Sequence, residues 1–139
     1  MPRVAAIVVD LALVVLFVVI GRASHAEPLN VDGLLRTGLP FVAGTLMAWI
    51  GFLLKRRTGL TVPNGVFVWA MTLVLGMLFR LLLGDTADPA FIVVAALFLA
   101  LFLIGWRAVR WLVRRRRGTS APTKDPRRSG NPAVRNAGR

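Results

Sequence analysis

Basic residues gather at points where apolar runs of the chain begin or end. Arg22 and His25 follow the first run, Arg36 opens the second, and Arg80 lies one turn before the end of the third. If consecutive runs are antiparallel helices, these four side chains reach one level on one side of a bundle. Clustered guanidinium groups suit the recognition of phosphate or carboxylate. The sequence therefore predicts an anion-binding site made of Arg22, His25, Arg36 and Arg80.

Two further charges lie inside apolar runs. Asp10 is the only charged residue between Val4 and Ile20, and Arg107 follows Gly105 and Trp106 in the last run. Asp10 lies about six residues, or ~9 Å, into its run. A carboxylate there must be paired, protonated or in contact with water. We expect an ion pair with Arg107, which lies at the same level; an ion-coupling carboxylate and a hydrated one stay open as alternatives.

Simpler structural roles compete with the anion site. Arg80 can extend outward to a loop acid, for which the candidates are Glu27, Asp32, Asp85 and Asp88. The pentapeptide of residues 21–25 also suits a helix end, since glycine favours C-caps and a basic side chain complements the negative end of the helix dipole. Both interpretations remain alternatives to anion binding.

Catalysis is not expected. The chain has no cysteine and a single histidine, which excludes thiol nucleophiles and the usual zinc ligand sets. Ser24 and His25 are adjacent, but adjacency alone does not orient a hydroxyl toward an imidazole. We expect neither an enzyme nor a bound cofactor or metal.

The elements that position these residues are four apolar runs in a chain of 139 residues that is 56% hydrophobic. Each run is close to the ~20 residues that a helix needs to cross hydrocarbon, where the backbone must satisfy its own hydrogen bonds. We therefore expect an all-α, four-helix transmembrane bundle over residues 1–112. The expected helices cover about residues 4–21, 34–54, 66–83 and 90–112. The short connections carry turn formers, among them Pro63-Asn64-Gly65 in the second.

The first run also has features of a cleaved signal peptide, namely Arg3 before it and the small-x-small pattern of Ser24-His25-Ala26. The run is longer than a usual signal core and contains Asp10. We expect it to be retained as a helix.

The second run contains Pro40, beyond the first turn of the expected helix, which predicts a kink. The kink is explained either by packing or by a break that lines a ligand site. Glycine, alanine and threonine also recur at four-residue spacing in the last three runs, which permits close helix contact.

Lysine and arginine indicate the orientation. Fifteen of the eighteen lie on the side of Arg3, Lys55–Arg57 and the segment from Arg107 onward, and all four tryptophans fall near that side. The positive-inside rule then predicts a multi-pass protein of the cell membrane with both termini in the cytoplasm.

Residues 113–139 are basic and poor in apolar side chains, which predicts a disordered cytoplasmic tail. Such a tail suits a stop-transfer cluster or contact with anionic lipid headgroups. Nucleic-acid binding is not expected, because no aromatic side chains interleave the charges.

Several of these residues occur in order in a known family. They are Asp10, Gly21-Arg22 with Ser24-His25, Thr37 with Pro40-Phe41, Gly44, Thr72 with Gly76-Met77 and Arg80, Phe91, and Gly105-Trp106-Arg107. In this pattern the chain resembles the small actinobacterial and archaeal membrane proteins catalogued as domain of unknown function 3054. The resemblance covers about residues 3–112 and departs at Leu39, where tryptophan is usual. It implies four helices and no established activity.

Two functions follow as hypotheses. The first is the binding or carriage of an anionic solute or lipid headgroup through the basic cluster, with Asp10 as a coupling site; a carrier with four short helices would need to dimerise. The second is a non-catalytic accessory subunit of a larger membrane complex. A polar cavity leading from the cluster toward Asp10 would favour the carrier, whereas a dry interior with a flat exposed apolar face would favour the subunit.

Overall fold

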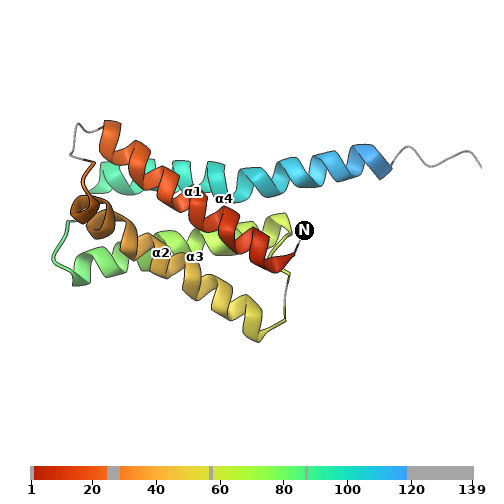
Figure 1. The fold of residues 1–139 in the computed structure, drawn as a ribbon, viewed down its shortest axis with the longest axis horizontal. Helices are drawn as coiled ribbons and strands as arrows, with labels where there is room; N and C mark the ends of the chain where they lie inside the picture. The colour runs from red at the N-terminus through yellow and green to blue at the C-terminus, as the bar shows by residue number, and fades with distance from the viewer. Residues whose placement is uncertain (1, 25–28, 57, 87, 119–139) are drawn as a thin grey trace, which may run out of the picture.

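The structure, a computed structural model, describes residues 2–24, 29–56, 58–86 and 88–118. This part of the chain forms four α-helices and no strand: α1 (Arg3–Ser24), α2 (Val31–Leu54), α3 (Val62–Leu82) and α4 (Pro89–Gly118). The α1–α2 and α3–α4 connections lie at one end of the bundle, and the α2–α3 connection lies at the other with the N-terminus (Figure 1). Each helix is long and apolar enough to cross a membrane. The expected all-α fold with four candidate membrane spans is confirmed.

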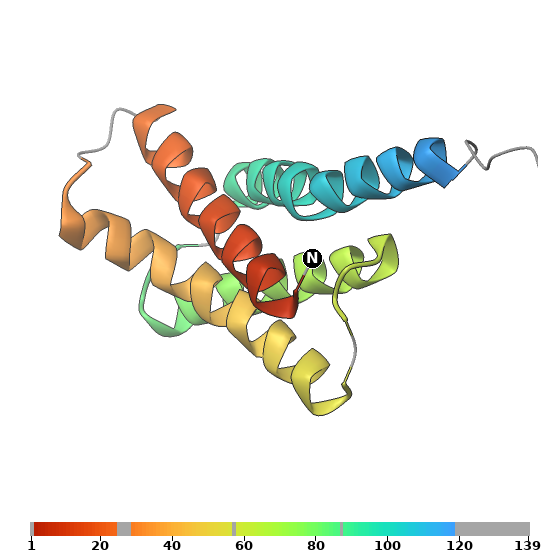
Figure 2. The ribbon, with the colours of Figure 1, turned by 45° about the vertical axis from the view of Figure 1, so that its right-hand side comes forward.

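The helices form a ring in chain order. α1 packs against α2 and α4, and α3 packs against the same two helices, while opposite helices make no close backbone contact within the described residues. α1 runs obliquely to α4 in both ribbon views (Figure 1, Figure 2). The interior of the ring is therefore filled by side chains from all four helices.

Two helices begin earlier than the sequence predicted because polar side chains cap them. The Asn30 side chain accepts a hydrogen bond from the Gly33 amide at 2.8 Å, and the Thr61 hydroxyl accepts one from the Asn64 amide at 3.4 Å. Pro63 lies in the first turn of α3, where the missing N–H has no intrahelical partner to lose. The prediction that Pro63 belongs to the preceding turn was wrong.

α1 ends later than predicted. Gly21 lies inside the helix, and the Ser24 hydroxyl donates to the carbonyls of Ile20 and Gly21 at 2.6 and 3.1 Å. Arg22 is in the last turn, where it complements the helix dipole. The helix continues past Gly21 to Ser24, because one glycine does not stop a helix whose backbone must stay hydrogen-bonded.

α4 also continues past its predicted end, through four consecutive arginines to Gly118. Arginine is a good helix former, and basic side chains stabilise a helix C-terminus. The predicted disordered tail is therefore wrong for residues 113–118, which extend the helix beyond the bundle (Figure 1). Residues 119–139 lie outside the described part of the chain.

α2 and α3 approach closely along small residues. A Cβ at Gly44 would lie 3.1–3.2 Å from backbone atoms of Met71 and Thr72, so only glycine fits without a shift. The buried hydroxyls of Thr45 and Thr72 are 2.9 Å apart, and Thr45 also donates to the Phe41 carbonyl. Close backbone contact and a shared hydrogen bond fix this pair of helices.

Pro40 is buried within α2, which continues through it. Because proline has no N–H, the carbonyl of Arg36 lacks its usual helical donor. The proline lies one residue before Phe41, whose ring packs edge-to-face on Phe17 with centroids 5.4 Å apart. The structure therefore places Pro40 at a packed contact between α1 and α2.

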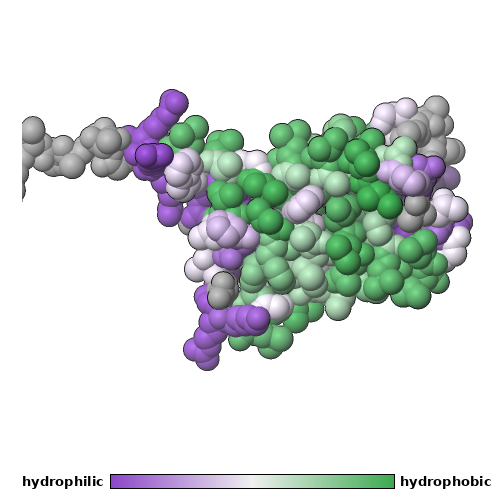
Figure 3. Space-filling model, turned by 180° about the vertical axis from the view of Figure 1, so that it is seen from behind, coloured by the Kyte–Doolittle hydropathy of each residue, from purple (hydrophilic) through white to green (hydrophobic). Residues whose placement is uncertain are grey.

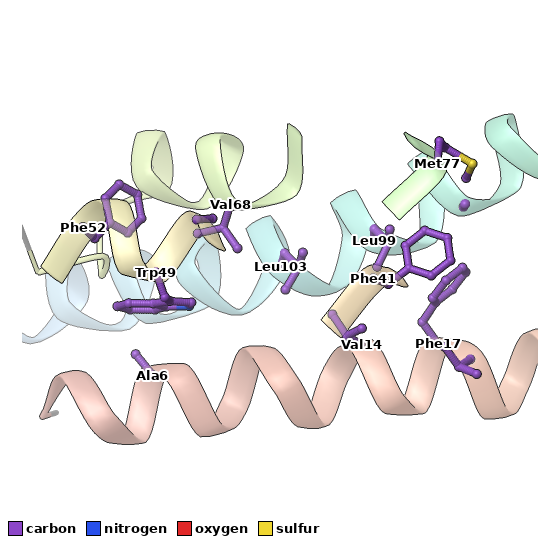
Figure 4. Close-up of a cluster of buried hydrophobic side chains, with 13 residues drawn as sticks. Ala6, Val14, Phe17, Phe41, Trp49, Phe52, Val68, Met77, Leu99 and Leu103 are labelled. Atoms are coloured by element: carbon purple, nitrogen blue, oxygen red, sulfur yellow. The ribbon is translucent and has the colours of Figure 1, made fainter. Parts of the chain in front are cut away.

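The core runs the length of the bundle, with Val14 and Phe17 of α1 facing Phe41 of α2 and Leu99 of α4 (Figure 4). Outside the core, the visible face carries a broad apolar band between two hydrophilic ends (Figure 3). That division into an apolar belt and polar ends is what a bilayer requires of a protein that spans it.

Candidate functional site

Asp10 is held at the centre of a buried polar cluster. Its side chain is fully buried, and Arg107 donates to it from both terminal nitrogens, Nη1 to Oδ1 at 2.9 Å and Nη2 to Oδ2 at 2.7 Å. The indole Nε1 of Trp49 donates to Oδ2 and that of Trp106 to Oδ1, each at 2.9 Å. Each carboxylate oxygen thus accepts two hydrogen bonds. The structure brings together the Asp10 and Arg107 pair that the sequence predicted.

Arg107 is equally well satisfied. Its side chain is fully buried, with Nε donating to the Gly59 carbonyl at 2.9 Å and Nη1 to the Leu103 carbonyl at 2.6 Å. The guanidinium also lies 4.5 Å from the centre of the Trp106 ring. We call Asp10, Trp49, Gly59, Trp106 and Arg107 the Asp10 clamp. It connects α1, α2, α4 and the α2–α3 connection through charge-assisted hydrogen bonds, which are the strong class.

Two glycines let the Asp10 clamp close. Gly59 has a φ of +67°, and a Cβ there would overlap the Trp49 ring. A Cβ at Gly65 would lie 2.5 Å from Cδ of Arg107. Glycine is therefore required at both positions, at Gly59 by conformation as well as by space.

The tryptophans are the part of the clamp that sequence reasoning missed. The sequence indicated only that Trp49 and Trp106 fall near one side of the bundle, whereas in the structure Trp49 is buried and both indoles donate to Asp10. Trp69 is also engaged, donating to the Ala96 carbonyl at 2.9 Å. Of the four tryptophans, all of which lie in the described residues, only Trp111 is exposed. The available signal was the shared depth of Asp10, Trp49 and Trp106 in the sequence.

The opposite end of the bundle contains a cavity of about 570 Å³ between α1, α2, α4 and the end of α3. We call it the outer cavity. Its polar lining comprises Arg22, Arg36, Thr37, Arg80, Asp85 and Asp88. Its apolar lining includes Phe17, Val18, Phe91 and Val94. A few polar groups over an apolar wall, in a volume of this size, are typical of a small-molecule site.

The structure thus brings Arg22, Arg36 and Arg80 to one cavity, as the sequence predicted. His25, the fourth residue of that prediction, lies outside the described residues, as does Glu27. The three arginines face two lining carboxylates, so the described lining carries an excess of positive charge.

Two of the arginines are engaged by the protein. Arg36 forms a salt bridge with Asp85, with Nη2 and Nε donating to Oδ1 at 2.9 and 3.2 Å, although its side chain is 66% exposed. Arg22 donates to the Thr37 hydroxyl at 3.0 Å and lies against Gly33. These contacts hold both guanidinium groups at the wall of the outer cavity.

Arg80 is placed differently. Its guanidinium lies 4.7 Å from the centre of the Phe91 ring, and its one hydrogen bond within the described residues is a 3.5 Å contact from Nη2 to the Thr86 carbonyl. The buried Nε has no acceptor within the same part of the chain. Asp85, a predicted partner, instead binds Arg36, and Asp88 accepts a hydrogen bond from the Ala90 amide at 2.7 Å at the start of α4. Among the described residues Nη1 of Arg110 is the other buried side-chain nitrogen without an acceptor, but only Arg80 lines the outer cavity. There the guanidinium can donate charge-assisted hydrogen bonds to an anion.

The outer cavity and the Asp10 clamp are separated by apolar packing. Val14, one turn of α1 beyond Asp10, is fully buried, as are Phe41, Leu99 and Leu103 (Figure 4). Phe17 forms part of the cavity wall. Neither Asp10 nor Arg107 lines the outer cavity. The structure therefore places the two predicted sites in separate environments.

Among the described residues, no three His, Asp or Glu side chains are grouped so as to hold a metal ion. The polar chemistry that stands out in the bundle is a closed ion pair and an open cationic cavity, framed by four apolar helices. These features define a multi-pass α-helical membrane protein with a cavity at one end. The family model described as "Protein of unknown function (DUF3054)" matches residues 7–110, and the chain belongs to that family. The matched segment contains both the Asp10 clamp and the lining of the outer cavity. No curated protein and no solved structure matches the chain.

Proposed function

We propose that the protein binds an anion, carried by a small solute or a lipid headgroup, in the outer cavity. The observation that carries the proposal is Arg80, which lines the cavity with its guanidinium over Phe91 and makes one long hydrogen bond, of 3.5 Å, within the described residues. Arg22 and Arg36 add positive charge at the same level. Phosphate and carboxylate groups match the planar guanidinium in geometry and charge.

Binding is favoured over passage through the bundle. The side chains between the outer cavity and the Asp10 clamp are buried and apolar, and Asp10 already accepts four hydrogen bonds. An ion moving inward would have to displace this packing and would find no unsatisfied group at Asp10. The proposed role is therefore recognition at one side of the membrane.

Anions are expected to stabilise the folded protein. With the full chain in phosphatidylcholine nanodiscs, phosphate should raise the melting temperature of the wild type, since a ligand at one hundred times its Kd adds about 2.7 kcal/mol. Arg80→Gln should reduce that increment at least by half. Gly21→Leu should reduce it too, because Gly21 lines the cavity and a Cβ there meets no atom within 4 Å. Differential scanning fluorimetry measures each shift.

The matched control is Gly51→Leu. Gly51 also lies inside a helix, and a Cβ added there would meet no atom within 4 Å, but it does not line the outer cavity. It should keep the full phosphate increment. If phosphate, sulfate and carboxylates all leave the wild-type melting temperature unchanged, the proposal fails and an accessory-subunit role becomes the better explanation.

We also propose that both termini are cytoplasmic and that the outer cavity opens on the far side of the cell membrane. The support is the distribution of charge, since Arg3, Lys55 and Arg56 lie at the end opposite the cavity, with the arginine-rich end of α4. The positive-inside rule places such basic segments in the cytoplasm.

Single cysteines test this orientation without background, because the chain has none. Leu29→Cys and Thr86→Cys, in the two connections at the cavity end, should react with a membrane-impermeant maleimide in intact cells. Thr58→Cys, in the α2–α3 connection, should react only after permeabilisation. The reverse pattern would invert the orientation and place the outer cavity in the cytoplasm.

A further inference from the structure

The outer cavity borders a second, apolar hollow. This groove of about 160 Å³ lies between α1 and α2 and is lined by Val15, Val18 and Val19 of α1 and by Leu35, Gly38 and Leu39 among the residues of α2. Val18 lines both hollows, so they are neighbours separated by one side chain. We call the second hollow the α1–α2 groove.

The α1–α2 groove faces the surroundings of the bundle. Val15, Leu35 and Leu39 are each more than half exposed, and they belong to helices long enough to span a membrane. Polar atoms contribute almost nothing to its lining. Apolar surface exposed along a membrane-spanning helix faces hydrocarbon, so the groove is suited to an acyl chain.

The wall of the outer cavity leads to the same conclusion. Phe17, Phe91 and Val94 present apolar surface beside the three arginines. A small hydrated anion would use the arginines and leave that surface in contact with water. A ligand with a charged head and an apolar body would use both.

We propose that the ligand is an anionic amphiphile of the surrounding leaflet, with a phosphate or carboxylate headgroup at Arg80 and one hydrocarbon chain in the α1–α2 groove. This inference rests on the proposed anion site and adds the chemical class of its ligand. Gly38 contributes to the geometry, because a Cβ there would already lie 3.7 Å from both methyl groups of Val18 and a longer side chain would fill the groove.

The first experiment compares two probes with one headgroup, methyl phosphate and dodecyl phosphate, added to the full chain in phosphatidylcholine nanodiscs. Leu39→Trp places a large side chain at the groove. Leu46→Trp is the matched control, since Leu46 is an exposed leucine of the same helix outside the groove. We expect Leu39→Trp to weaken the binding of dodecyl phosphate at least fivefold and to leave the binding of methyl phosphate unchanged. Leu46→Trp should bind both probes as the wild type does.

The second experiment locates the chain directly and does not depend on a variant that folds. Dodecyl phosphate with a diazirine at mid-chain is irradiated in the same nanodiscs, and adducts are mapped by peptide mass spectrometry. Adducts within residues 15–19 and 34–42, displaced by unlabelled dodecyl phosphate and reduced in Arg80→Gln, support the inference. Equal labelling of Leu97 and Leu101, exposed residues of α4 that line neither hollow, would overturn it.

The two proposals fail separately. A phosphate-dependent shift in melting temperature, combined with diffuse labelling and no effect of Leu39→Trp, overturns the chain site and leaves the anion site intact. The absence of any shift with methyl or dodecyl phosphate in the wild type overturns both.

Discussion

Asp10→Asn is expected to lower the free energy of unfolding by about 3–5 kcal/mol, because it leaves the Arg107 charge buried without a counter-ion. Arg107 is fully buried with Nη1 and Nη2 on the carboxylate. Asparagine can still accept from an indole, but it cannot neutralise the guanidinium. Arg107→Gln should cost a similar amount, since it strands the carboxylate.

A double-mutant cycle separates pairing from general damage. Asp10→Asn with Arg107→Gln should lose less than the sum of the single losses, because neither residual group carries a charge. Asp32→Asn serves as a control carboxylate, exposed in the first turn of α2, and should cost ~1 kcal/mol or less. Reversible unfolding of the wild type and the four variants in one lipid or detergent system gives the loss of unfolding free energy for each variant. Strictly additive losses would show that the charges do not stabilise each other.

Gly44→Val is expected to destabilise the bundle by about 1–3 kcal/mol or more through overpacking. A Cβ at Gly44 meets backbone atoms of Met71 and Thr72 at 3.1–3.2 Å, and backbone cannot rotate away as a side chain can. The helices α2 and α3 would have to separate, which would also lengthen the contact between Thr45 and Thr72.

Gly51→Val is the matched comparison for Gly44. Both substitutions exchange glycine for valine inside α2, so the change in intrinsic helix propensity is the same. A Cβ at Gly51 meets nothing within 4 Å. The difference between the two unfolding free energies therefore reports packing alone. Equal stabilities would mean that the close approach at Gly44 does not hold α2 against α3.

The two ends of the bundle differ in how their charges are satisfied. At the Asp10 clamp the guanidinium nitrogens and carboxylate oxygens of the ion pair all have partners within the protein, so the clamp acts as a structural connection between helices. At the outer cavity Arg80 keeps a buried donor without an acceptor in the described residues, beside a hollow large enough for a ligand. This contrast is why we assign a structural role to the Asp10 clamp and propose recognition at the outer cavity.

The sequence by itself determined the membrane-spanning class, the number of helices and the level of each charge along them. These properties depend on local quantities, namely the length of each apolar run and the rise of a helix per residue. The pairing of Asp10 with Arg107 was predictable for the same reason, because two opposite charges at one depth in hydrocarbon have few other partners.

Only the tertiary structure decided which side chains face one another around the bundle. The rotation of each helix about its axis places the indoles of Trp49 and Trp106 against Asp10. It also pairs Arg36 with Asp85 and leaves Arg80 beside Phe91. That rotation is set by contacts between helices, such as the approach of Gly44 to the α3 backbone, which no single apolar run encodes. The outer cavity and the α1–α2 groove arise in the same way, since each hollow forms where the side chains of neighbouring helices leave space between them.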